Sequence, residues 1–206
     1  MNWTLQNAII LAAVCLLVGI AGGWMLGGLQ SPSATGRAQN AAVPAEQASG
    51  AAPQMSGAQR TQRMADSQAA PMIEKLKATP GDPALLTTIG NIYYDAKLYA
   101  IAIDYYGHVL KQKPADVSVR TDMGTAYWYM GNADTAIDEF NKALTYEPTS
   151  PNTLFNRGLV KWNGKNDAAG ALADWDKLLK ANPNYEGKDN VLKMIAEVKQ
   201  QKSAKP

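Results

Sequence analysis

The chain has 206 residues, with 20 Lys and Arg against 18 Asp and Glu and a formal net charge of +2. Because this charge is small and the basic residues are dispersed, the sequence argues against nucleic-acid binding. The single cysteine, Cys15, excludes a disulfide bond within the chain and a thiolate metal cluster.

The N-terminal part contains an apolar run, Ala8 to Leu29, without a charged residue. The run is long enough to cross about 30 Å of hydrocarbon as a helix, so we expect residues 1–29 to be a transmembrane anchor. A cleaved signal peptide is the alternative, but no Lys or Arg precedes the run and no convincing small-residue cleavage site follows it. Glycines recur every fourth residue on one face of this helix, which permits close helix approach and leads to the hypothesis of self-association into a homo-oligomer. These glycines are Gly19, Gly23 and Gly27.

Residues 30–70 consist mainly of Ala, Gln, Ser, Gly and Pro, with almost no aromatic or branched aliphatic residues to build a core. We expect a disordered linker with an average reach of about 30 to 40 Å. Within it, Arg37 is the one basic residue close to the apolar run, and by itself it weakly favours a cytoplasmic C-terminal part.

A repeat begins after the linker. Its most regular marker is a proline that recurs at intervals of 34, 34 and 35 residues, namely Pro80, Pro114, Pro148 and Pro183. Small and aromatic residues keep the same register: Gly90, Gly124 and Gly158; Ala102, Ala136 and Ala171; Tyr106, Phe140 and Trp175. A glycine inside a helix costs about 1 kcal/mol relative to alanine, so close packing must offset it, and we expect Gly90 to face Ala102. Each proline is expected to end the second helix of a unit.

These positions resemble the tetratricopeptide repeat (TPR) family from Pro83 to about Tyr185. The resemblance implies an all-α solenoid of helical hairpins with three units and flanking helices, which follows the one N-terminal transmembrane helix expected from the apolar run. The expected units are 83–116, 117–150 and 151–185. A partial-repeat helix is expected at 71–82, and a capping helix with a tail at 186–206.

Three charged residues depart from the family pattern. Arg157 and Lys161 occupy places where an aliphatic and an aromatic residue are usual, which makes the packing of the third unit less certain. Arg120 is expected to lie at a helix surface. The third unit is one residue longer than the others, and we place the extra residue in the turn around Gly164 to Asp167.

The soluble part contains no sequence motif that is typical of catalysis. It contains no phosphate-binding glycine loop, paired-histidine metal helix or nucleophile motif with partners. His108 is the only histidine and is interpreted as a helix-surface residue. Asp138 and Glu139 are adjacent but point in different directions on a helix, so we interpret them as solvated charges. We therefore expect a protein without enzymatic activity and without a cofactor.

The TPR resemblance implies that the first helix of each unit lines a concave peptide-binding groove. Residues at the matching positions are Thr87, Asn91, Tyr94, Thr121, Thr125, Trp128, Tyr129, Phe155, Leu159 and Trp162. Tyr94, Trp128 and Trp162 are each 34 residues apart and would form a row of rings suited to a helix or an apolar peptide. The alternative is that these rings pack against neighbouring helices. The clamp with which some TPR proteins hold a C-terminal carboxylate is not expected, because Thr87 and Asp122 stand where basic or amide groups are needed.

The leading hypothesis is a membrane-anchored, non-catalytic scaffold or adaptor that binds a peptide or helix of another protein. A narrower hypothesis follows from the helix MIEKLKATPGDP, which, after an N-terminal span, resembles the TPR part of bacterial cytochrome c maturation proteins. That resemblance implies presentation of apocytochrome to the haem-attachment machinery and a soluble domain on the periplasmic, extracytoplasmic side. A third hypothesis is a membrane scaffold that assembles with itself.

Overall fold

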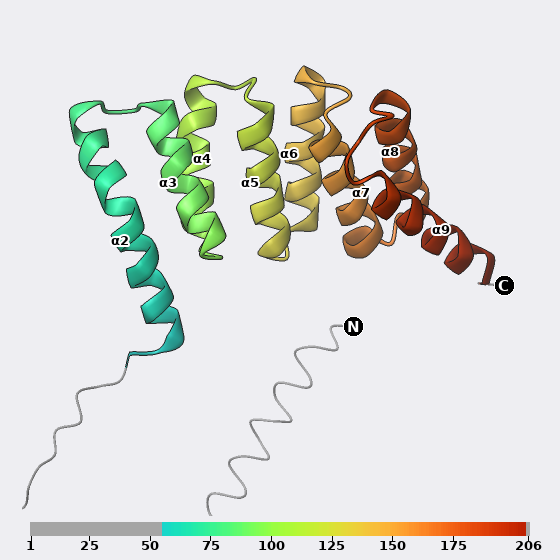
Figure 1. Ribbon diagram of the computed structural model, residues 1–206, viewed down its shortest axis with the longest axis horizontal. Helices are drawn as coiled ribbons and strands as arrows, with labels where there is room; N and C mark the ends of the chain where they lie inside the picture. Colours follow the sequence, from blue (N-terminus) through green and yellow to red (C-terminus); the bar gives the residue numbers. More distant parts are fainter. Residues whose placement is uncertain (1–54, 205–206) are drawn as a thin grey trace, which may run out of the picture. The chain divides into compact units, whose positions relative to one another are not determined.

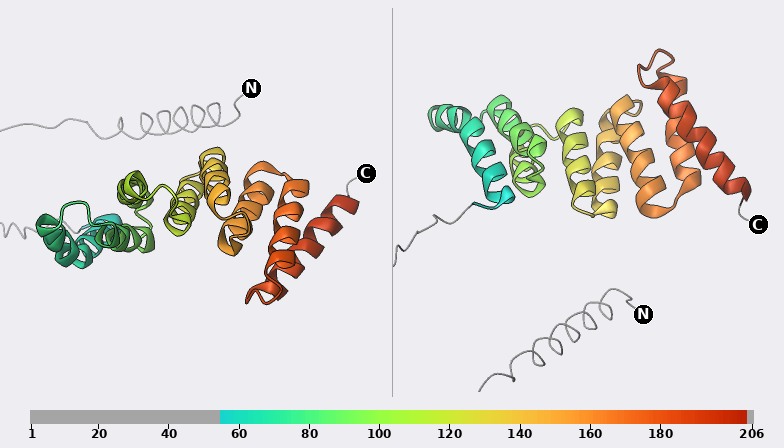
Figure 2. Two further views of the ribbon diagram at one scale, coloured as in Figure 1. Left: turned by 90° about the horizontal axis from the view of Figure 1, so that it is seen from above. Right: turned by 60° about the horizontal axis from the view of Figure 1, so that its bottom comes forward.

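The structure of the protein, a computed structural model, describes residues 55–204 (Figure 1). In this range the chain forms eight α-helices: α2 (Gly57–Ala78), α3 (Pro83–Asp95), α4 (Tyr99–Gln112), α5 (Val117–Tyr129), α6 (Ala133–Tyr146), α7 (Pro151–Lys165), α8 (Ala168–Ala181) and α9 (Lys188–Ala204). Consecutive helices pack as antiparallel neighbours and follow one another along the long axis of this unit (Figures 1 and 2). The expected all-helical TPR solenoid is thereby confirmed for the described residues.

The expected transmembrane helix, with Gly19, Gly23 and Gly27, lies outside the described residues, as do residues 30–54 of the expected linker. Between residues 55 and 204, none of the helices combines the length and the apolar character needed to span a membrane.

Three hairpins form the body of the solenoid. They consist of α3 with α4, α5 with α6, and α7 with α8, and their first helices begin at Pro83, Val117 and Pro151, where the three units were expected to begin. The recurring prolines lie two residues beyond the last residue of α2, α4, α6 and α8. This is where a residue without a backbone N–H stops a helix from continuing. Carboxylates cap α3 and α5: Asp82 Oδ1, for example, accepts the N–H of Ala84 at 2.8 Å at the start of α3.

The recurring glycines allow an aromatic ring of the second helix to lie on the backbone of the first. A Cβ atom on Gly158 would lie 2.3 Å from Nε1 of Trp175, a side chain that is completely buried. Equivalent Cβ atoms would lie 2.6 Å from the Tyr106 ring at Gly90 and 2.7 Å from the Phe140 ring at Gly124. The Tyr106 ring is thus the nearest neighbour of Gly90, and at the equivalent Gly124 an added Cβ would also lie 3.2 Å from the backbone oxygen of Ala136, the small residue of the second helix.

The helix before the first unit begins earlier than the sequence predicted. We expected residues 30–70 to be disordered and the helix to span 71–82, whereas α2 begins at Gly57. A capping box fixes this start, since the Ser56 hydroxyl accepts the Gln59 N–H at 3.2 Å and Gln59 Oε1 accepts the Ser56 N–H at 2.9 Å.

The additional turns of α2 also have tertiary contacts. Ala65 and Ala69 are buried, and the Tyr93 hydroxyl of α3 donates a hydrogen bond to Asp66 Oδ1 at 2.9 Å. The partner carboxylate and burial raise the pKa of Tyr93 to about 12, with burial the larger cause. Alanines provide enough apolar contact here because small side chains let α3 approach closely, which a composition poor in large apolar residues does not reveal.

The extra length of the third unit lies near the expected position, but in helix α7 rather than in the turn. α7 has 15 residues against 13 in α3 and in α5, and the turn after it is correspondingly shorter. Asn166 closes α7 in the left-handed conformation, with φ 54°, a conformation that asparagine tolerates better than most residues.

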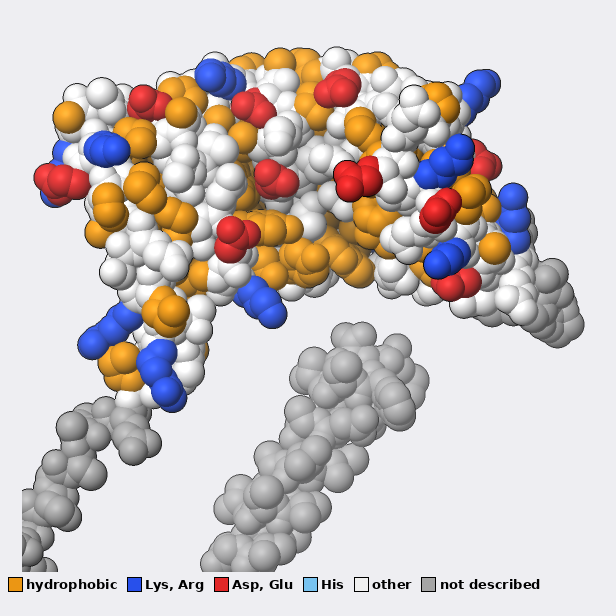
Figure 3. Space-filling view, in the orientation of Figure 1, with side chains coloured by type: hydrophobic (Ala, Val, Ile, Leu, Met, Phe, Trp, Pro, Cys, Tyr) orange, Lys and Arg blue, Asp and Glu red, His pale blue; other side chains and the backbone are white. Residues whose placement is uncertain are grey.

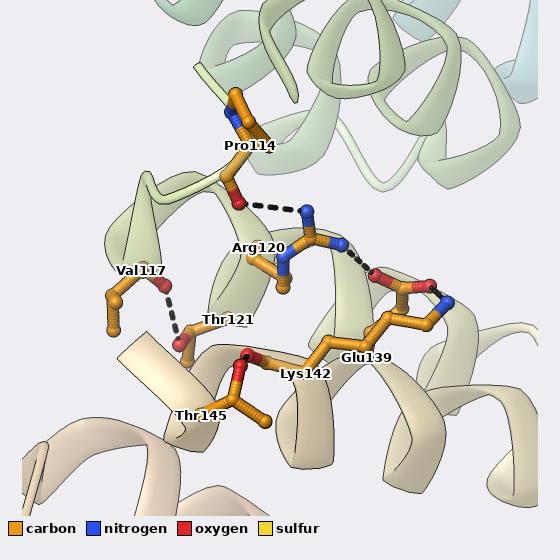
Figure 4. Close-up of polar contacts among 7 residues, drawn as sticks. All are labelled: Pro114, Val117, Arg120, Thr121, Glu139, Lys142 and Thr145. Carbon is orange, nitrogen blue, oxygen red and sulfur yellow. Dashed lines mark hydrogen bonds and ion pairs between the residues drawn. The ribbon is translucent and has the colours of Figure 1, made fainter. Parts of the chain in front are cut away.

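Arg120 and Glu139 of the second unit form a largely buried ion pair, which the exposed Lys142 joins (Figure 4). Arg120 Nη1 lies 2.7 Å from Glu139 Oε2, and its Nη2 donates to the Pro114 carbonyl at 2.9 Å. Lys142 Nζ lies 2.7 Å from the other carboxylate oxygen, Oε1. The interpretation of Arg120 as a surface residue and of Glu139 as a solvated charge is therefore wrong. Two opposite charges offset the cost of burying this carboxylate.

The third unit repeats the arrangement with different residues. Arg157 contacts both carboxylate oxygens of Asp174 through Nε and Nη2, and its Nη1 donates to Asn141 Oδ1 at 2.7 Å. Lys161 Nζ lies 2.8 Å from Asp174 Oδ2. Asp174 precedes the buried ring of its helix, as Glu139 does in α6. The two residues that depart from the family pattern thus neutralise a buried acid instead of loosening the unit.

Helix α9 covers the apolar end of the stack. Val191, Ile195 and Val198 are buried and share a core cluster with Trp175 and Leu178 of α8. Figure 2 shows α9 at the C-terminal end of the row of hairpins. The helix covers the last unit as expected, and its outward-facing charged residues keep that end polar.

Candidate functional site

The candidate groove is formed by the first helices α3, α5 and α7. Two hydrogen bonds connect α5 directly to α7: Thr121 Oγ1 lies 2.7 Å from Thr153 Oγ1, and Asn156 Nδ2 donates to Thr125 Oγ1 at 3.3 Å. Because Thr121 and Thr153 are buried, this pair belongs to the floor of the groove rather than to its open surface.

The expected polar groove residues are mostly engaged within the protein. The hydroxyls of Thr87, Thr121 and Thr125 each donate to a carbonyl one turn earlier in their own helix. Asn91 is exposed, but its Oδ1 accepts the Tyr106 hydroxyl at 2.8 Å. These side chains position the helices, and only the amide nitrogen of Asn91 is left to face solvent.

The expected row of aromatic rings divides into two kinds. Trp128 is half-buried against the next unit, since a Cβ atom on Gly164 would lie 2.6 Å from its ring. Trp162 is half-buried as well, packs against the C-terminal core and lines a cavity of about 630 Å³. Tyr94 instead contacts other tyrosines. The three rings thus contact different parts of the protein: Tyr94 contacts the tyrosines of the first two units, Trp128 the third unit, and Trp162 the C-terminal core.

A tyrosine trio, Tyr94, Tyr99 and Tyr129, lies at the end of the groove near the α3–α4 turn. The ring centroids of Tyr94 and Tyr99 are 5.5 Å apart in an edge-to-face arrangement, and those of Tyr99 and Tyr129 are 5.0 Å apart and stacked. Tyr129 is 57% exposed, so the trio offers an open aromatic surface. Tyr99 was missed because α4 is a second helix and the equivalent position of the next unit is Ala133, so the period gives no signal.

A cavity of about 340 Å³ lies between α5 and α7. Its lining is mainly polar and comprises Val117, Ser118, Thr121, Asp122, Glu147, Ser150, Pro151, Asn152, Phe155 and Asn156. Phe155 is half-buried beside Tyr185, with ring centroids 6.5 Å apart, while Leu159 packs into the C-terminal core. Asp122 and Asn156 therefore join the candidate site.

The electrostatics of the groove centre on Asp122. Its pKa is raised to about 6, chiefly by burial and further by the negative charges of Asp116 and Asp95. Burial also raises the pKa of Tyr94, with additional contributions from Tyr129 and Asp122. Figure 3 shows hydrophobic side chains gathered over the lower parts of α5 and α6, with acidic side chains above them. The groove is thus aromatic and anionic.

No group of three or more His, Cys, Asp and Glu among residues 55–204 is arranged to hold a metal ion. His108 is exposed on α4, beside an apolar cavity of about 450 Å³ between α2 and the first hairpin.

Comparisons with known proteins support a tetratricopeptide repeat. Residues 117–150 match the family described as "Tetratricopeptide repeat", and no curated protein matches the chain in sequence. A similar solved structure is the MamA protein, with a TM-score of 0.57, 20% identity, and coverage of 69% of this chain and 77% of that chain. The first TPR of Spaghetti (RPAP3) bound to an HSP90 peptide has a TM-score of 0.54 and 20% identity over 59% and 94%.

A third similar structure is the Yersinia enterocolitica type III secretion chaperone SycD in complex with a peptide of the translocator YopD. Its TM-score is 0.53, with 19% identity over 57% of this chain and 92% of that chain. At these identities the likeness concerns the fold. Residues 117–150 thus resemble a tetratricopeptide repeat, and the described helices form a TPR-type solenoid.

Proposed function

We propose that the chain is a non-catalytic, membrane-anchored scaffold or adaptor that binds a peptide or helix of a partner protein in the groove of α3, α5 and α7. The observations that carry the proposal are the open tyrosine trio at one end of these helices and a cavity of about 340 Å³ between α5 and α7, which Asp122 lines. Exposed aromatic rings are typical anchors of peptide-binding surfaces. Two proteins of similar fold are in complex with a partner peptide, from HSP90 and from YopD.

The charge and hydrogen bonding in the groove argue against an acidic C-terminal peptide as its ligand. The HSP90 peptide in the Spaghetti complex has the sequence SRMEEVD, which ends in carboxylates. Here Thr87 bonds to its own helix and Asp122 places a carboxylate in the groove, where like charge opposes such a ligand.

Membrane anchoring rests on the apolar run from Ala8 to Leu29, and self-association on the glycine face within it. Crosslinking in membranes tests self-association, and recovery of monomer alone would contradict it.

The cytochrome c maturation version rests on the resemblance of residues 72–83, which form the end of α2 and the turn to α3. It requires a periplasmic domain, so labelling of a cysteine introduced at exposed Asp138 by a membrane-impermeant reagent in intact cells tests it.

The proposed function is tested by photo-crosslinking in cells from position 129, with position 138 as the control. Tyr129 is exposed in the groove, and Asp138 is exposed on α6, a second helix. We expect one partner segment to be captured from position 129 and not from position 138. Equal capture from both positions, or capture only from 138, would show that the groove is not the binding surface. Recovery of the chain itself from position 129 would support the self-assembling scaffold instead.

A further inference from the structure

The carboxylates withdrawn from water differ in whether a cation neutralises them. Glu139 is paired with Arg120 and Lys142, and Asp174 with Arg157 and Lys161, so each has two cations within 3 Å. Asp122 in the groove is also withdrawn from water, but its side chain makes no ion pair or hydrogen bond with another residue of the described range. The protein therefore leaves one desolvated anion without a cation of its own.

Further negative charge lies next to Asp122. Asp95 follows Tyr94 at the end of α3 and acts electrostatically on both Tyr94 and Asp122. Its side chain is exposed and likewise forms no ion pair with a described residue. Because two carboxylates repel each other, the free groove is at its least favourable when both are ionised, and a bound cation would relieve this repulsion.

The tyrosine trio gives this anionic region a second feature that suits a cation. Tyr94 comes from α3, Tyr99 from α4 and Tyr129 from α5, and the Tyr94 and Tyr129 centroids are 6.3 Å apart. Asp122 and Tyr129 are seven residues apart on α5, so they lie on the same side of the helix about two turns apart. Aromatic faces within about 6 Å attract ammonium and guanidinium groups, and carboxylates hydrogen-bond to them.

We propose that this end of the groove receives a lysine or arginine side chain of the partner peptide, held between the tyrosine trio and the carboxylates of Asp95 and Asp122. The inference rests on the proposed function, since it names the chemistry of the peptide bound in that groove. The neighbouring cavity between α5 and α7 takes the adjoining residues of the same peptide.

The test is selection of phage-displayed random peptides on the full chain in mild detergent. Three proteins are compared: the wild type, the double variant Asp95→Asn/Asp122→Asn, and the control Asp104→Asn/Asp138→Asn, whose carboxylates are exposed on the second helices α4 and α6. We expect the wild type and the control to enrich peptides containing Lys or Arg, and the groove variant to lose this preference. Replacing the basic residue of an enriched peptide by norleucine should weaken binding to wild type about tenfold, and binding to the groove variant far less.

The alternative outcomes separate this inference from the proposed function. Peptides without a basic residue that compete at position 129 would overturn the cation site and leave the groove as a peptide-binding surface. Peptides that bind the groove variant and the wild type equally would have the same meaning. If selected peptides bind only outside the groove, as shown by crosslinking from position 138 but not 129, both the inference and the proposed function are wrong.

Discussion

Replacing Gly158 by alanine tests the contact between a glycine and an aromatic ring that sets the distance between the two helices of a hairpin. The new Cβ would lie 2.3 Å from Trp175 Nε1 and 2.7 Å from its Cε2. The ring is completely buried, and its Nε1 donates to the Phe155 carbonyl at 3.2 Å, so the ring cannot move without losing this hydrogen bond. The helices must separate or the ring must leave its position.

The expected loss of stability follows from three opposing effects. Overpacking a core costs about 1 to 3 kcal/mol, and loss of the hydrogen bond from Trp175 about 1 kcal/mol. Alanine regains about 1 kcal/mol of helix propensity over glycine. The net free energy of unfolding should therefore fall by about 1 to 3 kcal/mol, which lowers Tm by several degrees.

Gly107 provides the matched control. It lies inside α4, and no atom lies within 4 Å of a Cβ at this position. Gly107→Ala should therefore raise the free energy of unfolding by about 0.5 to 1 kcal/mol through helix propensity alone. Both variants are measured by thermal denaturation followed by circular dichroism. If Gly158→Ala stabilises the protein as Gly107→Ala does, the account of the hairpin spacing is wrong.

Three further predictions concern charge and hydrogen bonding. Folding raises the pKa of Asp122 to about 6, so the folded state loses stability as pH rises from about 4 to 6. Asp122→Asn should therefore raise Tm at pH 7.5 by the equivalent of about 1 to 2 kcal/mol and leave Tm unchanged near pH 4. A change in Tm that does not depend on pH would refute this cause. Arg120→Met leaves the buried carboxylate of Glu139 without its main partner and should lower the free energy of unfolding, measured in urea, by about 3 kcal/mol. The control Lys77→Met breaks an exposed ion pair and should lower it by less than about 0.5 kcal/mol. Similar losses in the two variants would contradict the burial argument. Tyr93→Phe removes the hydrogen bond to Asp66 and should lower the free energy of unfolding by about 1 kcal/mol. It should also increase amide hydrogen exchange in the first turns of α2. Unchanged exchange would show that α3 does not stabilise these turns.

The repeat could be predicted from the sequence because its markers recur at one interval. Each proline ends a helix for the same local reason, so position alone placed the hairpins. The ring that lies nearest to Gly90 was not predicted, because a glycine shows that something approaches closely but not that it is the Tyr106 ring. The N-terminal half of α2 was missed since its contacts are made by alanines and by a hydrogen bond from the next helix.

Charged residues were the least predictable part of the fold and of the site. Burial of Arg120 and Glu139 depends on their meeting across a hairpin, which no single-helix pattern encodes. In the groove, positions taken over from the family found Tyr94 and Tyr129 but not Tyr99, which comes from a second helix and has no aromatic counterpart in the next unit. The sequence showed that Asp122 is unsuited to a carboxylate clamp, and the structure shows that it lines a cavity whose described lining includes no Lys or Arg.

The central claim is that the groove of the first helices binds the partner, and it is tested most directly by the affinity of the segment captured from position 129. Isothermal titration calorimetry compares the wild type with Tyr94→Ala/Tyr129→Ala and with Tyr146→Ala, which removes an exposed ring on α6. The account predicts at least about 30-fold weaker binding for the groove variant, because aromatic contacts at the centre of an interface contribute about 2 kcal/mol or more. It predicts unchanged binding for Tyr146→Ala. Equal affinity of all three proteins would contradict the account.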